Sequence, residues 1–248
     1  MTARLRHLVL ATDDLAATTA AARTWLGVAP GIADAEAMLD FDLEHEILVL
    51  GSAYLEIVAP LGNRLELPGA KFLARHGPGG YMLDLQVPDL EEILTEAAKL
   101  GVEPVLRDVY RENYICQLHP RDFGTLLEVD QITGGRDWHW DAEFSPAERS
   151  AERALPVAAQ LAVPDPAQMA HRWARVFGGG LDVDTNSVLL SGVTISFVAA
   201  AGGPTGLASV DVQVPADVEP GEQEIAGVIF RRQHGVTTTA SHESGSTT

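Results

Sequence analysis

The chain has 248 residues, of which 46% are hydrophobic and 21% are charged, which is enough for one or two domains with a proper core. It carries 17 Lys and Arg against 35 Asp and Glu, so its net charge is −18. This charge argues against a nucleic-acid-binding protein, which neutralises phosphates with a basic surface. It also disfavours binding to an anionic membrane surface.

The single cysteine and the apolar segments limit the chemistry and the compartment. Cys116 is the only cysteine, which rules out an intramolecular disulfide and a cysteine-based zinc site, and we interpret it as a buried structural thiol. No apolar stretch reaches the roughly 18 residues of a membrane span, and the N-terminus lacks the features of a signal peptide. We therefore expect a cytoplasmic protein.

A pattern of a short apolar strand, an acidic helix start, a helix and a final glycine occurs three times. The aspartate and glycine of each copy are Asp14 and Gly27, Asp89 and Gly101, and Asp165 and Gly178. An aspartate accepts hydrogen bonds from the free N–H groups of a helix start, and glycine adopts the left-handed conformation that ends a helix. Twelve or thirteen residues separate the members of each pair, so we predict helices of about three turns.

Further apolar runs predict the strands that complete these units. They are Leu43–Leu50, Ala53–Ala59, Ser187–Leu190 and Val193–Ala199. Residues 209–215 repeat the sequence of residues 82–88 closely, but no helix pattern follows them. We predict four modules, the last one abbreviated. Their boundaries define a first domain at residues 1–135, a linker at 136–154, a degenerate second domain at 155–233 and a disordered tail at 234–248.

Three segments of the first domain resemble the vicinal oxygen chelate superfamily, which includes glyoxalase I, extradiol dioxygenases, methylmalonyl-CoA epimerase and antibiotic-resistance binding proteins. They are Arg6–Leu15, Ala53–Leu61 and Gly124–Val129. The resemblance implies an α+β fold in which paired βαβββ modules form U-shaped mixed sheets, here as two tandem domains. The segments at 56–62 and 70–80 look most like the epimerase branch.

The resemblance also implies a metal site inside the U-shaped sheet. It places metal ligands at His7, Glu56 and Glu128, and such a set suits Mn, Co, Zn, Fe or Ni. The remaining position, commonly histidine, is Met82 here, and a thioether is a poor ligand for these ions; we expect Met82 and Tyr81 to contact substrate. The alternative is a metal-free pocket, in which two nearby buried carboxylates would be destabilising.

The second domain carries no comparable set of ligands. The positions equivalent to the four ligand positions are Ala158, Ser196, Ser209 and Arg231. This set of four side chains does not form a plausible metal site. We therefore expect any active site to lie within residues 1–131.

The resemblance to the epimerase branch suggests which residues would move a proton. That branch carries a catalytic glutamate near Glu44 and Glu46, which share one face of a strand while His45 faces the other way; a solvated strand is the alternative for both. Arg121 is our candidate for binding an anionic group of the substrate. The segment at residues 138–140 is expected to pack between the domains.

Three functions remain open. The first is a metal-dependent isomerase, epimerase or lyase that acts on a small carbonyl or acyl-thioester substrate through a metal-stabilised enolate. The second is a metal-free protein of the same fold that only binds a small molecule, and the third is an Fe(II) dioxygenase. In each case the partner is a small molecule, neither nucleic acid nor a membrane is involved, and a homodimer is a possible assembly.

Overall fold

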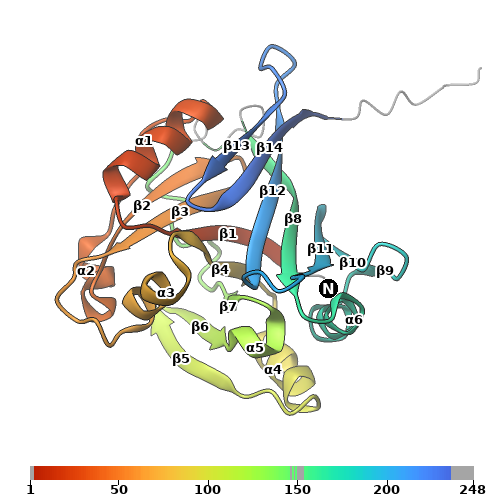
Figure 1. Ribbon diagram of the computed structural model, residues 1–248. Helices are drawn as coiled ribbons and strands as arrows, with labels where there is room; N and C mark the ends of the chain where they lie inside the picture. Colours follow the sequence, from red (N-terminus) through yellow and green to blue (C-terminus); the bar gives the residue numbers. More distant parts are fainter. Residues whose placement is uncertain (1–2, 146, 148, 150–153, 236–248) are drawn as a thin grey trace, which may run out of the picture.

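The computed structural model describes residues 3–145, 147, 149 and 154–235. Its two halves each form one mixed sheet of seven strands, with a few short helices beside them (Figure 1). The predicted α+β class and the tandem arrangement of similar modules are therefore confirmed.

The first half consists of two modules that meet in the middle of one sheet. Its elements are β1 (Arg4–Ala11), α1 (Leu15–Leu26), α2 (Ala35–Met38), η1 (Leu39–Phe41), β2 (Leu43–Leu50), β3 (Ala53–Pro60), α3 (Pro68–His76), β4 (Gly79–Gln86), α4 (Leu90–Ala98), β5 (Pro104–Tyr110), β6 (Asn113–Leu118), α5 (Pro120–Phe123) and β7 (Leu126–Gln131). The strand order is β2-β3-β1-β4-β7-β6-β5. Strand β1 runs antiparallel to β4 at the junction of the modules, and each runs parallel to the last strand of its own module. Between α1 and β2, Ile32 forms an isolated antiparallel bridge to Ile47.

The second half repeats the plan of the sheet, but α6 is its only helix among the described residues. Its elements are β8 (Leu155–Val163), α6 (Pro166–Phe177), β9 (Gly180–Asp182), β10 (Ser187–Leu190), β11 (Val193–Ala199), β12 (Gly206–Val214), β13 (Gly221–Ile225) and β14 (Val228–His234). The sheet order is β13-β14-β12-β8-β11-β10-β9. No helix separates β12 from β13, so the abbreviated last module is confirmed. Strand β14 extends to His234, and residues 236–248 of the predicted tail lie outside the described residues.

The helix ends follow the chemistry expected from the sequence. The predicted aspartates cap α1, α4 and α6 by accepting a hydrogen bond from the backbone N–H three residues ahead: Asp14 from Ala17, Asp89 from Glu92, and Asp165 from Gln168. The predicted glycines follow the helices with positive φ angles of 68°, 73° and 71° at Gly27, Gly101 and Gly178. The three repeats are therefore confirmed as strand–helix units.

One hydrophobic core runs through both halves, because helices of one half pack against helices of the other. The rings of Phe123, Trp173 and Phe177 contact one another, and the Trp173 indole N–H donates to the Phe123 carbonyl at 3.1 Å. Cys116 lies in this core with no exposed surface, and burial raises the pKa of its thiol to about 12. It is therefore a buried thiol, as predicted, and not a nucleophile.

Strands β4 and β12 bring the two sheets together at a seam that has room for glycine only. A Cβ atom on Gly80 would lie 2.4 Å from the Cβ of Leu207. On the other side, Gly227 has a φ of +73°, and a Cβ there would lie 2.5 Å from the carbonyl oxygen of Pro78. The close approach of the two halves thus depends on the absence of side chains at these positions.

We predict that Gly80→Ala lowers the free energy of unfolding by about 1–3 kcal/mol, because the added methyl group must push β4 and β12 apart. Urea unfolding of the two proteins measures this difference. Gly79→Ala is the matched control, since its Cβ would have only an ordinary contact of 3.5 Å with Phe72. Equal stabilities of the two alanine variants would show that the seam tolerates a side chain.

Candidate functional site

The first sheet holds a cavity of about 350 Å³. Alternate residues of its central strands face this cavity, as the period of two along a strand requires: His7 and Val9, Glu56 and Val58, Met82 and Asp84, and Leu126, Glu128 and Asp130. Residues of α2, η1 and the start of α3 line it as well, together with residues 138–140. The cavity therefore collects polar side chains from strands that are far apart in the sequence.

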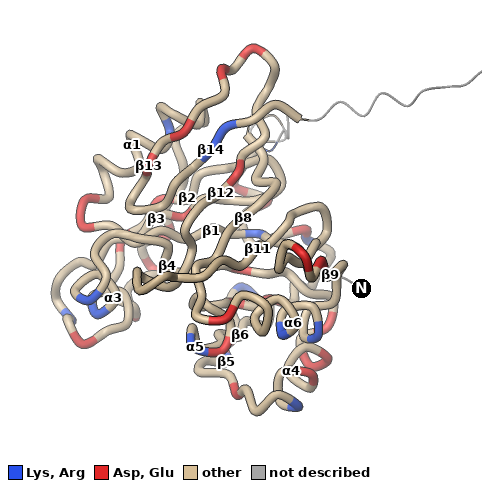
Figure 2. The backbone as a smooth tube through the Cα atoms, turned by 45° about the vertical axis from the view of Figure 1, so that its right-hand side comes forward, with Lys and Arg blue, Asp and Glu red and all other residues tan. Residues whose placement is uncertain are grey.

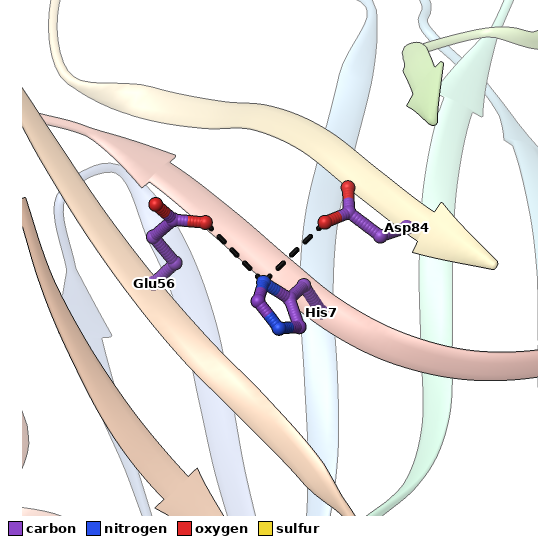
Figure 3. A group of neighbouring side chains, drawn as sticks. All are labelled: His7, Glu56 and Asp84. Atoms are coloured by element: carbon purple, nitrogen blue, oxygen red, sulfur yellow. Dashed lines mark hydrogen bonds and ion pairs between the residues drawn. The ribbon is translucent and has the colours of Figure 1, made fainter. Parts of the chain in front are cut away.

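A buried cluster of one histidine and two carboxylates lies at the centre of the sheet (Figure 3). The Nδ1 atom of His7 lies 3.2 Å from an oxygen of Glu56 and 3.3 Å from Oδ2 of Asp84. One ligand atom from each of the three residues lies within 4.8 Å of the others. Asp84 is placed there because β4 pairs it directly with His7 of β1.

Fixed hydrogen-bond donors determine which nitrogen of each histidine carries the proton. The indole N–H of Trp138 donates to Nε2 of His7 at 2.8 Å, so the neutral His7 ring carries its proton on Nδ1 and donates to Glu56. The backbone N–H of Asp34 likewise donates to Nε2 of His45 at 2.7 Å, and Nδ1 of His45 lies 2.5 Å from Glu56. Glu56 therefore accepts one hydrogen bond from each imidazole.

This arrangement keeps Glu56 ionised inside the protein. Burial by itself raises the pKa of this carboxyl, but the hydrogen bonds from His45 and His7 outweigh burial and lower the pKa to about 2. Burial lowers the pKa of His7, although the neighbouring Glu56 opposes that shift. The pair therefore consists of a charged carboxylate and a neutral imidazole at neutral pH.

The buried carboxyl of Asp84 is less well compensated by neighbouring groups than that of Glu56. Burial raises the pKa of Asp84 well above its usual value, and the charges of Glu128, Asp130 and Glu56 raise it further. The Oδ1 atom of Asp84 is buried without a hydrogen-bond partner. Among the described residues, no lysine or arginine lines the cavity. The cavity therefore contains more acidic groups than its own side chains can neutralise.

A second hydrogen-bonded pair extends this network along β7. The Nε2 atom of His139 lies 2.7 Å from Oδ2 of Asp130, and its Nδ1 faces the side-chain amide of Asn113 at 3.1 Å. Because the Asn113 carbonyl oxygen accepts from the Thr133 backbone, its NH₂ group is the donor to His139. Burial lowers the pKa of His139 to about 3, so this imidazole is neutral too.

The segment at residues 138–140 packs on the first sheet, which corrects the prediction that it lies between the domains. Trp138 and Trp140 belong to a buried cluster with Ile47 and Tyr54 of β2 and β3. The Arg6 guanidinium lies 5.0 Å from the centre of the Trp138 ring and forms an ion pair with Asp137. The partners of both tryptophans are thus side chains of the first half. From there the two rings line the cavity.

The structure brings five of the predicted site residues together at the cavity. They are His7, Glu56, Tyr81, Met82 and Glu128. Oε2 of Glu128 accepts a hydrogen bond of 2.7 Å from Gln117. The cluster also contains Asp84, which the sequence interpretation missed; its signal is a single acid inside the apolar strand 82–88, on the same face as Met82.

The other predicted residues lie away from the cavity. Glu46 faces the opposite side of β2, where its carboxylate accepts from the Gly31 backbone at 2.8 Å, and Glu44 is exposed. Of the three residues 44–46, only His45 lines the cavity. The side chain of Arg121 is 76% exposed and pairs with Asp122. Catalytic roles for the two glutamates and substrate binding by Arg121 thus have no support from their positions.

Among the described residues, a group of three or more potential ligands that are close enough for one metal ion occurs only in the first half. In the second half, Arg231 pairs with Glu222 at 2.9 Å and with Asp211 at 3.6 Å. That position therefore holds an ion pair instead of a carboxylate ligand.

Comparison with known proteins identifies the fold. No protein-family model and no curated protein matches the sequence. A hypothetical protein from Staphylococcus aureus is similar in structure over 95% of this chain and 100% of its own, with a TM-score of 0.72 and 12% sequence identity. The methylmalonyl-CoA epimerase of Mycobacterium tuberculosis matches 52% of this chain and 88% of its own, with a TM-score of 0.46 and 25% identity. A variant of the Streptomyces coelicolor epimerase matches 54% and 97%, with a TM-score of 0.46 and 21% identity.

The chain shares its fold, over almost its whole length, with the hypothetical protein from Staphylococcus aureus. At this level of identity the similarity identifies the fold and leaves the reaction open. In the part of the chain that the structure describes, no helix is long and apolar enough to cross a membrane.

We predict that Glu128 contributes a loss of stability as the pH rises from about 4.5 to about 7. Burial raises the pKa of Glu128 from 4.5 to about 7, although the hydrogen bond from Gln117 opposes the shift. Between these values Glu128 holds its proton in the folded protein but not in the unfolded chain, so its contribution to the free energy of unfolding falls as the pH increases. His7 and His139, whose pKa values burial lowers, contribute a slope of the opposite sign. Urea unfolding across this range, with a chelator present, measures the slope.

The variant Glu128→Gln tests the assignment of this slope, because glutamine does not titrate and preserves the hydrogen-bonding shape. It should remove the contribution of Glu128 and leave those of the other groups, since burial also raises the pKa values of Asp84 and Asp130 and lowers those of His7 and His139. An unchanged slope in the variant would show that Glu128 ionises normally in the folded state.

Proposed function

We propose that the cavity of the first half is the site of a divalent-metal-assisted isomerase or lyase that acts on a small carbonyl compound. The observation that supports this most is the buried cluster of His7, Glu56 and Asp84, whose ligand atoms lie within 4.8 Å of one another. Glu128 faces the same cavity from β7, next to Asp84 in the strand register. We propose that it completes the set of ligands.

The donor set suits a divalent ion in its chemistry and in its charge. One imidazole and several carboxylates are typical ligands of Mn, Fe, Co, Ni or Zn. The buried and unpartnered Oδ1 of Asp84 is a ligand atom that a cation would satisfy. Such an ion supplies Lewis-acid stabilisation for the negative charge that develops on a carbonyl oxygen when the adjacent carbon loses a proton.

The protein's own residues would position and shield the reacting groups. His45 holds Glu56 in place through the opposite carboxylate oxygen from the one that faces His7. Tyr81 and Met82 line the cavity beside the cluster and reduce its contact with water. The cavity volume of about 350 Å³ is large enough for a small organic molecule or for the reacting end of a larger one.

One contact in the structure has to change when an ion binds to His7. If Nδ1 of His7 held an ion, it would give up its proton, and the neutral ring would carry the proton on Nε2. That proton would face the indole N–H of Trp138, which now donates to Nε2 at 2.8 Å. Loading of the site should therefore move the Trp138 side chain, which makes its fluorescence a direct probe.

We predict that the purified protein binds about one equivalent of Mn²⁺ or Zn²⁺ and that Asp84→Asn and His7→Ala each weaken this binding at least tenfold. Each variant removes one ligand atom of the cluster. Elemental analysis of the protein and calorimetric titration of the chelator-treated protein measure the effect.

The matched control is Asp108→Asn, the same change at a residue that lines the cavity outside the cluster. It should leave the affinity within about twofold of the original value, since an exposed carboxylate contributes little. Absence of a bound ion together with absence of affinity on titration would contradict the metal-assisted reaction.

A second candidate is a metal-free binding protein, and the hydrogen bonds of the histidines favour it. His7, His45 and His139 each have one ring nitrogen that faces a fixed donor and one that faces a carboxylate. In this state the protons of the rings, instead of a metal, satisfy the carboxylates. The two candidates differ in whether a metal displaces the proton of His7.

We predict that His7 carries its proton on Nδ1 in the chelator-treated protein and that Trp138→Phe converts it to a mixture of tautomers. Long-range ¹⁵N NMR distinguishes the two tautomers directly. The variant should also lose about 1–3 kcal/mol of stability, because it leaves a buried acceptor without its donor. Trp140→Phe is the control, a change of the same size on the same wall.

Addition of Zn²⁺ to the original protein separates the two functions in the same experiment. Loss of the proton from Nδ1 supports the metal-assisted site. If the His7 signals remain unchanged at saturating Zn²⁺, the metal-free binding protein is the correct interpretation. A proton on Nε2 before any metal is added would contradict the hydrogen-bond arrangement itself.

A further inference from the structure

A second, open cavity of about 500 Å³ lies beside the site and contains residues of both halves. We call it the groove; its edges are formed by α3 and by the stretch from His119 to Thr125, and Thr205 and Gly206 contribute from the second half. It shares four lining residues with the site cavity, namely Pro68, Tyr81, Gln117 and Leu126. The two cavities are therefore direct neighbours.

The two cavities carry opposite charges. The groove is lined by Lys71, Arg75, His76 and His119, and none of its described lining residues is acidic. The site cavity has seven acidic lining residues and no lysine or arginine: Glu36, Asp40, Glu56, Asp84, Asp108, Glu128 and Asp130. In a chain with a net charge of −18, a wall of cations without an acid is unexpected.

The cations of α3 are available to a ligand. Lys71 and Arg75 lie one helical turn apart and are exposed, and neither has an ion-pair partner among the described residues. Most other arginines of the chain pair with a carboxylate, as Arg107 does with Glu91. The whole of α3 contains no acidic residue, and Figure 2 shows its positive segments at one edge of the molecule.

Apolar and aromatic residues line the groove together with these cations. Phe72 and Tyr81 meet there with their rings 5.2 Å apart, and Val105 and Leu126 line the groove as well. His119 adds a polar group, since its Nδ1 accepts the Arg121 backbone N–H and its neutral ring therefore carries the proton on Nε2. An apolar lining with a cationic edge fits an organic anion better than a simple inorganic ion.

We propose that the groove binds the anionic end of the same ligand whose reacting end enters the site cavity, so that the ligand is an organic anion with an apolar body. This inference rests on the proposed function, because it takes the site cavity as the place of reaction. The charges also set the direction of binding. The acidic cavity repels the anionic end, and the cations of α3 attract it, which leaves one favourable orientation.

The test uses phenyl phosphate, a small aromatic anion, with the full-length protein in low salt and chelator. Calorimetry should detect binding, and NMR signals of Tyr81 and Gln117 should shift because both residues lie between the two cavities. Phenol, which has the same ring without the charge, should bind at least tenfold more weakly. The chelator makes the measurement independent of any metal.

A pair of matched double variants locates the site. Lys71→Gln with Arg75→Gln should weaken phenyl phosphate binding at least fivefold, since both changes remove a cation from the groove. Lys99→Gln with Arg175→Gln removes one lysine directly after α4 and one arginine of α6, both outside the groove, and gives the same net charge. This control should bind within twofold of the original protein.

The outcomes separate the groove from the proposed function. Absence of phenyl phosphate binding, or an equal loss in both double variants, overturns the groove proposal even if the protein binds a divalent metal. Specific loss in the α3 variant supports the groove even if no metal binds. Because all four substituted residues are on the surface, circular dichroism of the variants verifies that they remain folded.

Discussion

The site is organised around one buried negative charge, the carboxylate of Glu56, which is only 8% exposed. A buried carboxylate needs compensating hydrogen bonds, and both oxygens of Glu56 receive them from imidazole nitrogens. Each imidazole then needs a donor for its other nitrogen, which Trp138 provides for His7 and the Asp34 backbone for His45. A single charge thus fixes two loops of the chain against the interior of the sheet.

The remaining carboxyls determine how the cavity can bind protons and cations. The carboxyl of Glu56 stays ionised. Burial and repulsion from neighbouring carboxylates raise the pKa values of Asp84 and Asp130, so these two groups keep their protons to a higher pH than in water. Similar carboxyls in one cavity therefore have different protonation states, which is a property of sites that handle protons or cations. The aromatic walls and the neighbouring cationic groove then decide which molecules can reach these groups.

Local features of the fold were predictable, but features that depend on register and distant contacts were not. The helix caps at Asp14, Asp89 and Asp165 depend on neighbouring residues only, and the structure has all three. Asp84 was missed because the pairing of β1 with β4 shifts at two irregularities, so counting along the strand does not give the residue opposite His7. Trp138 contacts His7 across 131 positions of sequence, and no periodicity indicates such a contact. The alternation of side chains between the two faces of β2 placed His45 on the opposite face from Glu44 and Glu46. It did not show which of the two faces was buried.

The missing helix of the last module has a structural consequence. Strands β13 and β14 occupy the end of the second half without a helix of their own, and α1 of the first half packs against β13 (Figure 1). Arg232 of β14 lies 4.5 Å from the centre of the Trp25 ring and donates to the Trp25 carbonyl. Helix α1 of the first half thus covers β13 and β14 of the second half. These strands in turn bury part of α1. The second half thus supports the first half structurally, although it contributes no residue to the His7, Glu56 and Asp84 cluster.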